Sequence, residues 1–331
     1  MTGHSRKLVI LFTAALALSG FGAYQHLSGN KPEKALEGET PVTVSALALP
    51  LSERDPSQHK AGSMRYVAGW ALTAGHANFG GFSGLVVTAE GKLVAISDRG
   101  DWLEADLDLE AANPLLNARM RPFSADAKGK SKAALDSESL IAKEDGFLVA
   151  FEGDHRLVEV AADRSTRLSP LTALMDFTGV PDNSGLEAIT LVGDRLFALP
   201  ERGTDVEGRL HGWLVGPEGS AAIYFRPPVG YSPTDAATMA NGDVLVLLRR
   251  YSPLDGVSAK VVRLEGHAIK PGATLEGEEL VHLEPPLAVD NMEGLDVIER
   301  PGALPLVVMI SDDNFRSSQR TLLLAFELES P

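Results

Sequence analysis

The feature that most constrains this fold is a segment that recurs five times along the chain. Each copy contains a short apolar run, a turn and a second run rich in Val, Leu, Ile and Phe. Aligned copies begin 54, 49, 48 and 58 residues after one another. The copies are GGFSGLVVTAEGKLVAISDRG (80–100), LDSESLIAKEDGFLVAFEGD (135–154), DNSGLEAITLVGDRLFALPERG (182–203), SPTDAATMANGDVLVLLRRY (232–251) and DNMEGLDVIERPGALPLVVMISDDN (290–314). Such a period predicts an array of similar units.

Each copy predicts a β-hairpin. The turns carry Glu90-Gly91, Asp145-Gly146, Gly193-Asp194 or Asn241-Gly242, dipeptides that tolerate positive φ. The second runs do not alternate apolar with polar residues, which is typical of strands covered on both faces. Further strands are expected after most copies, at 155–160, 221–226, 259–264, 279–283 and 320–328.

The predicted fold class is all-β, a single β-propeller of five or six four-stranded blades whose ring is closed by both termini. Two amino-terminal strands, 41–49 and 64–74, could close the fifth blade with the carboxy-terminal strand or contribute to a sixth. Either arrangement removes free sheet edges. Since the innermost strand of every blade starts on the same face, the open hairpin ends should surround one mouth of the central channel.

The amino-terminal segment differs in sequence from the repeated hairpins. Arg6 and Lys7 precede the apolar run LVILFTAALALSGFGA (8–23), which predicts a signal peptide or, if it is not cleaved, an anchor in the inner membrane. The domain organisation expected is a signal or anchor at 1–23, a tether with a lone strand at 24–62 and the propeller at 63–331. We therefore expect a periplasmic or secreted protein, and a monomer.

Composition excludes several classes of function. The chain has no cysteine, so disulfides, thiolate catalysis and sulfur metal sites are ruled out. Its formal net charge is −15, and it becomes −17 once residues 1–23, with two basic and no acidic residues, are removed. This excess of acid disfavours nucleic-acid binding, and it disfavours membrane contact except through the amino-terminal segment.

Acidic residues bracket the predicted hairpins at two positions, 14 residues apart in the first four copies and 19 apart in the fifth. The first position is occupied by Gly84, Glu138, Glu187, Asp235 and Glu293. The second is occupied by Asp98, Glu152, Glu201, Arg249 and Asp312.

Carboxylates gathered at a channel mouth repel one another unless they are protonated, paired with arginine or neutralised by a cation. Carboxylate oxygens suit hard ions such as calcium, so we expect Glu138, Glu152, Glu187, Asp235 and Glu293 as metal ligands. The alternative is that these groups only cap hairpins.

Arginines accompany the second position. They are Arg99, Arg202 and Arg249, whose planar forks suit phosphate or carboxylate oxygens. The expected catalytic set therefore combines proton acceptors with anion binders and comprises Asp98, Arg99, Glu201, Arg202, Arg249 and Asp312. The alternative is that the arginines only pair with the acids.

Several familiar motifs are missing. The stretch GGFSGL has Leu85 where a nucleophile elbow needs glycine, and the sequence has no H-E-x-x-H, P-loop or G-x-G-x-x-G motif. The histidines are scattered, and the tryptophans Trp70, Trp102 and Trp213 are expected to pack within blades.

Residues 64–328 resemble the bacterial phytase-like family, which is described as having esterase-like activity. The resemblance rests on five pairs of motifs in the expected order: FGGFSGL with ISDRG, DSESL with FEGD, SGLEAI with PERG, PTDAA with RRY, and NMEGLDV with SDDNF. It implies a calcium-assisted hydrolase of a small phosphoester or carboxylic ester. The scarcity of lysine in the ring region departs from a lysine-rich phosphate cradle.

The expected function is therefore an exported enzyme that binds a small anionic or ester substrate at an acidic channel mouth, with calcium as cofactor. Two alternatives remain open at this stage. One is a non-catalytic envelope propeller that binds a ligand or partner, and the other is a propeller lactonase.

Overall fold

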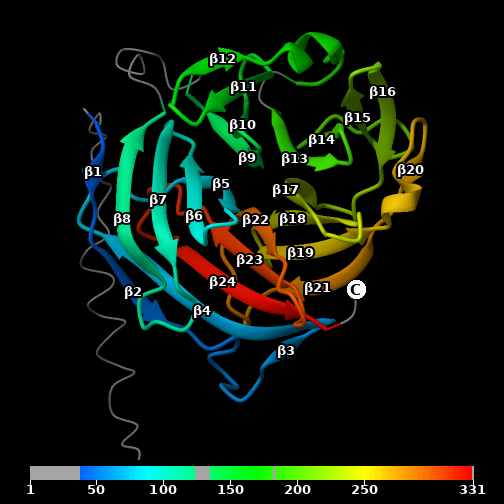
Figure 1. The fold of residues 1–331 in the computed structure, drawn as a ribbon. Helices are drawn as coiled ribbons and strands as arrows, with labels where there is room; N and C mark the ends of the chain where they lie inside the picture. The colour runs from blue at the N-terminus through cyan, green and yellow to red at the C-terminus, as the bar shows by residue number, and fades with distance from the viewer. Residues whose placement is uncertain (1–37, 124–134, 182–183, 330–331) are drawn as a thin grey trace, which may run out of the picture.

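A computed structural model describes residues 38–123, 135–181 and 184–329 as five sheets arranged around a central axis (Figure 1), with antiparallel pairing throughout except between β16 (Gly219–Phe225) and β20 (Thr274–Leu275). The innermost strands are β5 (Phe82–Val87), β9 (Ser137–Lys143), β13 (Leu186–Val192), β17 (Ser232–Thr238) and β22 (Met292–Ile298). Each packs against the innermost strands of the two neighbouring sheets, in this cyclic order. The prediction of a β-propeller is confirmed, with five blades.

Blades 1 to 3 follow the chain from the axis outward. Blade 1 continues from β5 through β6 (Lys92–Ser97), β7 (Asp101–Leu107) and β8 (Leu115–Pro122). Blade 2 continues from β9 through β10 (Gly146–Phe151), β11 (Arg156–Ala161) and β12 (Thr166–Leu168). Blade 3 continues from β13 through β14 (Arg195–Pro200), β15 (Leu210–Gly216) and β16 (Gly219–Phe225), and the short β20 (Thr274–Leu275) pairs with β16.

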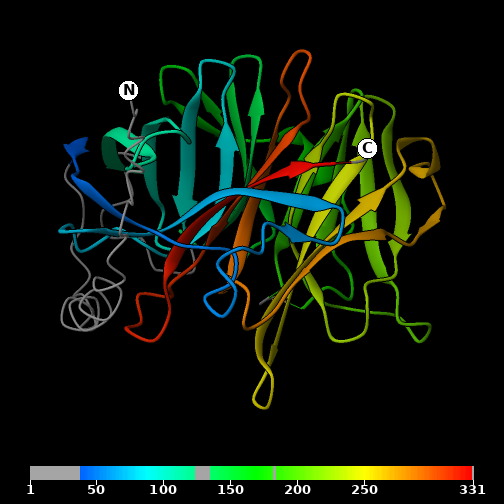
Figure 2. The ribbon, with the colours of Figure 1, turned by 90° about the horizontal axis from the view of Figure 1, so that it is seen from below.

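Blade 4 contains β17, β18 (Val244–Ser252), β19 (Gly256–Leu264) and β21 (Glu278–Leu283). Two 3-10 turns, η3 (Pro170–Leu174) and η4 (Gly266–Ala268), lie in connections between strands. The β18–β19 hairpin projects beyond the body of the ring (Figure 2). No helix in the described part of the chain is long and apolar enough to cross a membrane.

Both ends of the chain build blade 5. Its carboxy-terminal strands are β22, β23 (Leu306–Ser311) and β24 (Thr321–Leu328), and the amino-terminal β4 (Met64–Ala74) pairs with β24. Outside β4 lie β2 (Val44–Ala48) and β3 (Lys60–Ala61), while β1 (Thr40–Pro41) pairs with β8 of blade 1. Strands β2, β3 and β4 thus complete the fifth blade, and the described residues form no sixth.

The same pairings assign strands from 40 to 61 to the propeller, where the sequence reading expected a tether with one lone strand. The signal or anchor interpretation of residues 1–23 lies outside the described residues and stays a prediction.

The core lies between the blades, in five apolar clusters that each join two neighbouring blades. The apolar run of strand β10 contributes residues to two of these clusters. Leu148 and Ala150 pack toward blade 3, whereas Val149 and Phe151 pack toward blade 1. A strand buried on both faces needs apolar residues at consecutive positions, which explains the absence of alternation. The three tryptophans lie in these clusters, as predicted.

Candidate functional site

Each innermost strand carries an irregularity at the mouth of the channel. Its pairing with the second strand of the blade skips one residue, as in a β-bulge. The skipped residues are Ser83, Glu138, Glu187, Thr234 and Glu293. A bulge leaves its extra residue out of the ladder and re-aims its side chain, and bulges are common beside active sites. The bulges therefore define a ring of five equivalent positions, which we call the mouth ring.

The mouth ring differs from the expected one in two blades. The expected members Gly84 and Asp235 lie one residue beyond the bulge, and the equivalent residues are Ser83 and Thr234. The Ser83 hydroxyl donates to the carbonyl oxygen of Ser137, and the Thr234 hydroxyl donates to that of Met292 at 3.1 Å. Both hydroxyls therefore link neighbouring blades, and the acids of the mouth ring are three glutamates.

Asp235 lies deeper in the channel. Its carboxylate accepts hydrogen bonds from the Ser139 hydroxyl and from the backbone amides of Ala236 and Leu295. The side chain is buried, with 1% exposure, and each of its two oxygens accepts at least one of these hydrogen bonds. We therefore leave Asp235 out of the candidate cation site, where the sequence reading had placed it.

Residues at the second predicted position lie in a row at the same mouth. Asp98, Glu152, Glu201 and Asp312 each directly follow the last residue of a second strand, while Arg249 lies within β18. Electrostatic effects connect this row to the mouth ring. Beyond the effect of burial, the charge of Glu152 raises the pKa of Glu138, and the charge of Asp98 raises the pKa of Glu293.

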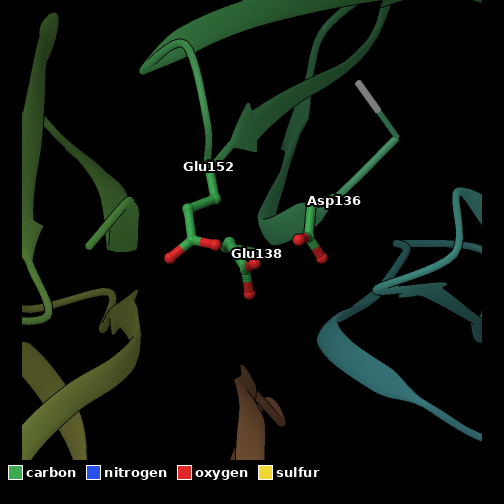
Figure 3. Close-up of side chains that lie close together, drawn as sticks. All are labelled: Asp136, Glu138 and Glu152. Carbon is green, nitrogen blue, oxygen red and sulfur yellow. The ribbon is translucent and has the colours of Figure 1, made fainter. Parts of the chain in front are cut away.

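Three carboxylates converge at the blade 2 side of the mouth. Asp136, Glu138 and Glu152 each offer an oxygen, and these oxygens lie within 4.8 Å of one another. Figure 3 shows the three side chains directed toward a shared space. Sequence reasoning missed Asp136, although its spacing of two residues from Glu138 would place both on one face of an extended chain. We call these residues the acidic cluster.

The acidic cluster fits a hard cation. Burial raises the pKa of Glu138 well above its ordinary range, and the charges of Glu187 and Asp136 add to the effect. Burial likewise raises the pKa of Glu152, against a hydrogen bond from the backbone amide of Gly185. An all-oxygen donor set of this kind is what calcium prefers, and a bound cation would favour the ionised carboxylates.

Arg249 occupies the opposite side of the mouth, between two acids. Its guanidinium lies 3.0 Å from Glu293 and 3.4 Å from Glu201. The charge of Glu293 raises the pKa of Arg249. Arg202 also pairs with Glu201, at 2.9 Å, but its side chain is 58% exposed. Both arginines thus form ion pairs with acids of the mouth, and part of the Arg202 side chain remains exposed to solvent.

Arg99 lies against an aromatic ring. Its guanidinium carbon is 3.3 Å from the centroid of the Phe315 ring, in the β23–β24 connection of blade 5. This contact joins the mouth loops of blades 1 and 5, so we assign Arg99 a part in holding these loops.

The mouth contains more negative than positive charge. Among the described residues, its carboxylates include those of Asp98, Asp136, Glu138, Glu152, Glu187, Glu201, Glu293 and Asp312. The arginines described there are Arg99, Arg202 and Arg249. Burial and neighbouring carboxylates raise the pKa of Glu187 and Asp312 well above their ordinary ranges, and they raise the pKa of Glu293 to about 7. Like charges held together in this way favour either protonation or cation binding.

Comparison with known proteins places this chain in a family. The family model described as Phytase-like, esterase-like activity of phytase, matches residues 77–315. The chain therefore belongs to the phytase-like family. No curated protein sequence matches it.

Solved structures with propeller folds are similar at low identity. A protein described as a proposed gluconolactonase shares 13% identity at a TM-score of 0.42, covering 85% of this chain and 92% of that one. Glutaminyl cyclase of Myxococcus xanthus shares 12% identity at a TM-score of 0.44, covering 80% and 97%. The PQQ domain of pyranose dehydrogenase from Coprinopsis cinerea shares 9% identity at a TM-score of 0.42, covering 86% and 97%. Likeness at this level says nothing about activity.

Proposed function

We propose that this protein is a calcium-assisted hydrolase of a small phosphoester or carboxylic ester, with its active site at the acidic mouth of the propeller. The observation that carries the proposal is the convergence of Asp136, Glu138 and Glu152, whose oxygens lie within 4.8 Å. Membership of a family described by esterase-like activity supports an ester as the bond that is hydrolysed.

The residues of the mouth divide into a cation side and an anion side. Asp136, Glu138 and Glu152 would hold calcium, which would supply positive charge to polarise a substrate oxygen and to acidify a water molecule. Arg249 and the exposed face of Arg202 would orient the anionic group of the substrate, since a guanidinium fork matches its oxygens.

We assign Asp312 as the acid that would take up a proton. Burial and the charges of Asp98 and Glu293 raise its pKa well above the ordinary range. A general base works best when its pKa lies near the operating pH. Its carboxylate accepts a hydrogen bond from the Asn314 amide at 2.6 Å, which fixes its orientation.

The proposal is tested by turnover of chromogenic phosphate monoester, phosphodiester and short acyl ester substrates by the purified protein. We expect one class to be hydrolysed, with the rate abolished by Glu138→Gln, Glu187→Gln or Glu293→Gln in variants that remain folded. A matched control is Glu218→Gln, because the Glu218 side chain is 91% exposed and lies far from the mouth in the β15–β16 turn. Unchanged rates in the three mouth variants would remove the mouth ring from the mechanism.

We also propose that the chain is exported, on the basis of the basic start and apolar run at 6–23. Amino-terminal sequencing of the protein from the periplasmic fraction of an expressing bacterium tests this. A mature chain that begins after residue 19 or 23 supports cleavage, retention of Met1 in the membrane fraction supports an anchor, and recovery only from the cytoplasm contradicts export.

A further inference from the structure

One layer of residues lies directly below the mouth ring. Each blade contributes the residue that follows its bulge. These residues are Gly84, Ser139, Ala188, Asp235 and Gly294. Four of these five residues are small. The exception is Asp235, whose side chain is 1% exposed.

The small residues are required by close packing around the axis. A Cβ on Gly84 would lie 3.1 Å from the amide nitrogen of Leu140 and 3.2 Å from the Cα of Ser139. A Cβ on Gly294 would lie 3.0 Å from the amide nitrogen of Leu85. The innermost strands therefore approach one another closely at this depth, and the Asp235 side chain enters the space that the other blades leave.

Asp235 connects three blades. One carboxylate oxygen accepts from the Ser139 hydroxyl at 2.9 Å and from the Ala236 amide at 2.9 Å. The other oxygen accepts from the Leu295 amide at 2.8 Å. Strand β9, which carries Ser139, is separated from β17 by β13 in the ring, so this hydrogen bond crosses the channel. Leu295 belongs to β22 in the next blade.

These contacts are adjacent to the glutamates of the mouth ring. Ser139 directly follows Glu138, and Leu295 lies two residues after Glu293. The two glutamates are bulge residues without a ladder partner, so neighbouring contacts must hold their strands in place. Blade 3 differs, because Ala188 follows Glu187 and makes no side-chain hydrogen bond to Asp235.

We propose that Asp235 is a positioning residue that holds the bulges of Glu138 and Glu293 at a fixed separation across the channel. It acts from below and does not touch the substrate or the cation. A consequence for the mouth, which rests on the proposed cation site, is that calcium affinity depends on Asp235. Substitution by asparagine leaves one acceptor oxygen for three donors, and alanine leaves none.

A half-buried carboxylate of strand β22, Asp296, provides the matched control. Asp296 accepts from the amides of Val87 at 2.6 Å and Val297 at 2.8 Å. It lies toward the other end of the channel, where it lines a cavity of about 240 Å³, and its contacts touch no bulge. Loss of this carboxylate should weaken the fold without moving the mouth ring.

Calcium titration calorimetry and peptide-resolved hydrogen exchange on the full-length chain test the proposal together. We expect Asp235→Ala to weaken calcium binding by about tenfold and Ser139→Ala to weaken it less, while Asp296→Asn stays within about twofold of the wild type. We also expect faster exchange in 137–143 and 292–298 of Asp235→Ala, with less change in 186–192 of blade 3. The Ser139→Ala variant keeps the test informative if Asp235→Ala does not fold.

Two results would overturn the proposal. One is equal calcium affinity in Asp235→Ala, Ser139→Ala and the wild type. The other is exchange that rises equally in all five innermost strands, since that would make Asp235 a general stabiliser. If the wild type itself binds no calcium, the proposed function fails, and the exchange pattern alone then decides whether Asp235 positions the bulges.

Discussion

Replacing Glu293 with glutamine tests whether the crowded acids of the mouth weaken the fold when no cation is bound. Burial raises the pKa of Glu293 from its ordinary value of 4.5 to about 7, although the charge of Arg249 lowers it. An acid of this kind binds its proton more tightly in the folded state than in the unfolded state. Its contribution to stability is therefore complete below about pH 4.5 and is lost as the pH rises to about 7.

The size of this loss of stability follows from the shift in the pKa of Glu293. The interval from 4.5 to about 7 corresponds to roughly 3 kcal/mol of unfolding free energy. For a propeller of this size, that is about 5 °C in Tm. Glutamine resembles the protonated acid, so we expect Glu293→Gln to match the wild type at pH 4.5 and to be more stable at pH 8 in chelator.

The assay is denaturant unfolding in chelator at several values between pH 4.5 and pH 8. Glu218→Gln, with its exposed side chain, serves as the control and should follow the wild type throughout. Added calcium at a hundred times its Kd should restore about 2.7 kcal/mol to the wild type at pH 8, and less at pH 4.5, where the acids are protonated. The reasoning is refuted if the wild type keeps the same stability over this range, or if Glu293→Gln shows the same pH dependence.

Three further substitutions test other parts of the structure. Leu148→Ala should lower the unfolding free energy by about 2–5 kcal/mol because Leu148 is fully buried between blades, whereas Leu168→Ala, at a site 62% exposed, should change it by less than about 0.5 kcal/mol; equal effects would contradict the interblade core. Arg249→Met should cost about 2 kcal/mol at pH 7, because two acids lose a partly buried partner, and the exposed Arg202→Met should cost less than about 0.5 kcal/mol. Asp136→Asn should weaken calcium binding in calorimetry by about tenfold, and an unchanged Kd would exclude Asp136 from the cation site.

Much of the fold could be predicted because its signals are local. Positive φ at Gly91, Gly193 and Gly242 agrees with the turns expected at those dipeptides, and the uninterrupted apolar run of β10 faces two neighbouring blades. The blade count could not be settled in this way. The partner of β4 is β24, at the other end of the chain, and nothing local in either strand specifies that pairing.

The site was predicted less completely, for a reason that lies in the bulges. An alignment on acids places Gly84 and Asp235 in the mouth ring, yet the ladder skips Ser83 and Thr234. A bulge shifts the register by one residue, and a shift of one residue sends a side chain to the other face. Because serine and threonine carry no charge, the aligned acids gave no sign of the shift. Asp136 was missed since it lies outside the repeated pair of positions.

The measurement that tests the central claim most directly is the rate of hydrolysis as a function of free calcium, using the best substrate of the three classes. The account predicts a rate that rises and saturates with calcium, falls to background in chelator and returns when calcium is restored. A rate that is the same in chelator and in calcium would contradict a cation at the acidic cluster. Absence of turnover with every substrate at every calcium concentration would contradict the enzyme itself and would favour a propeller that binds a ligand at its mouth.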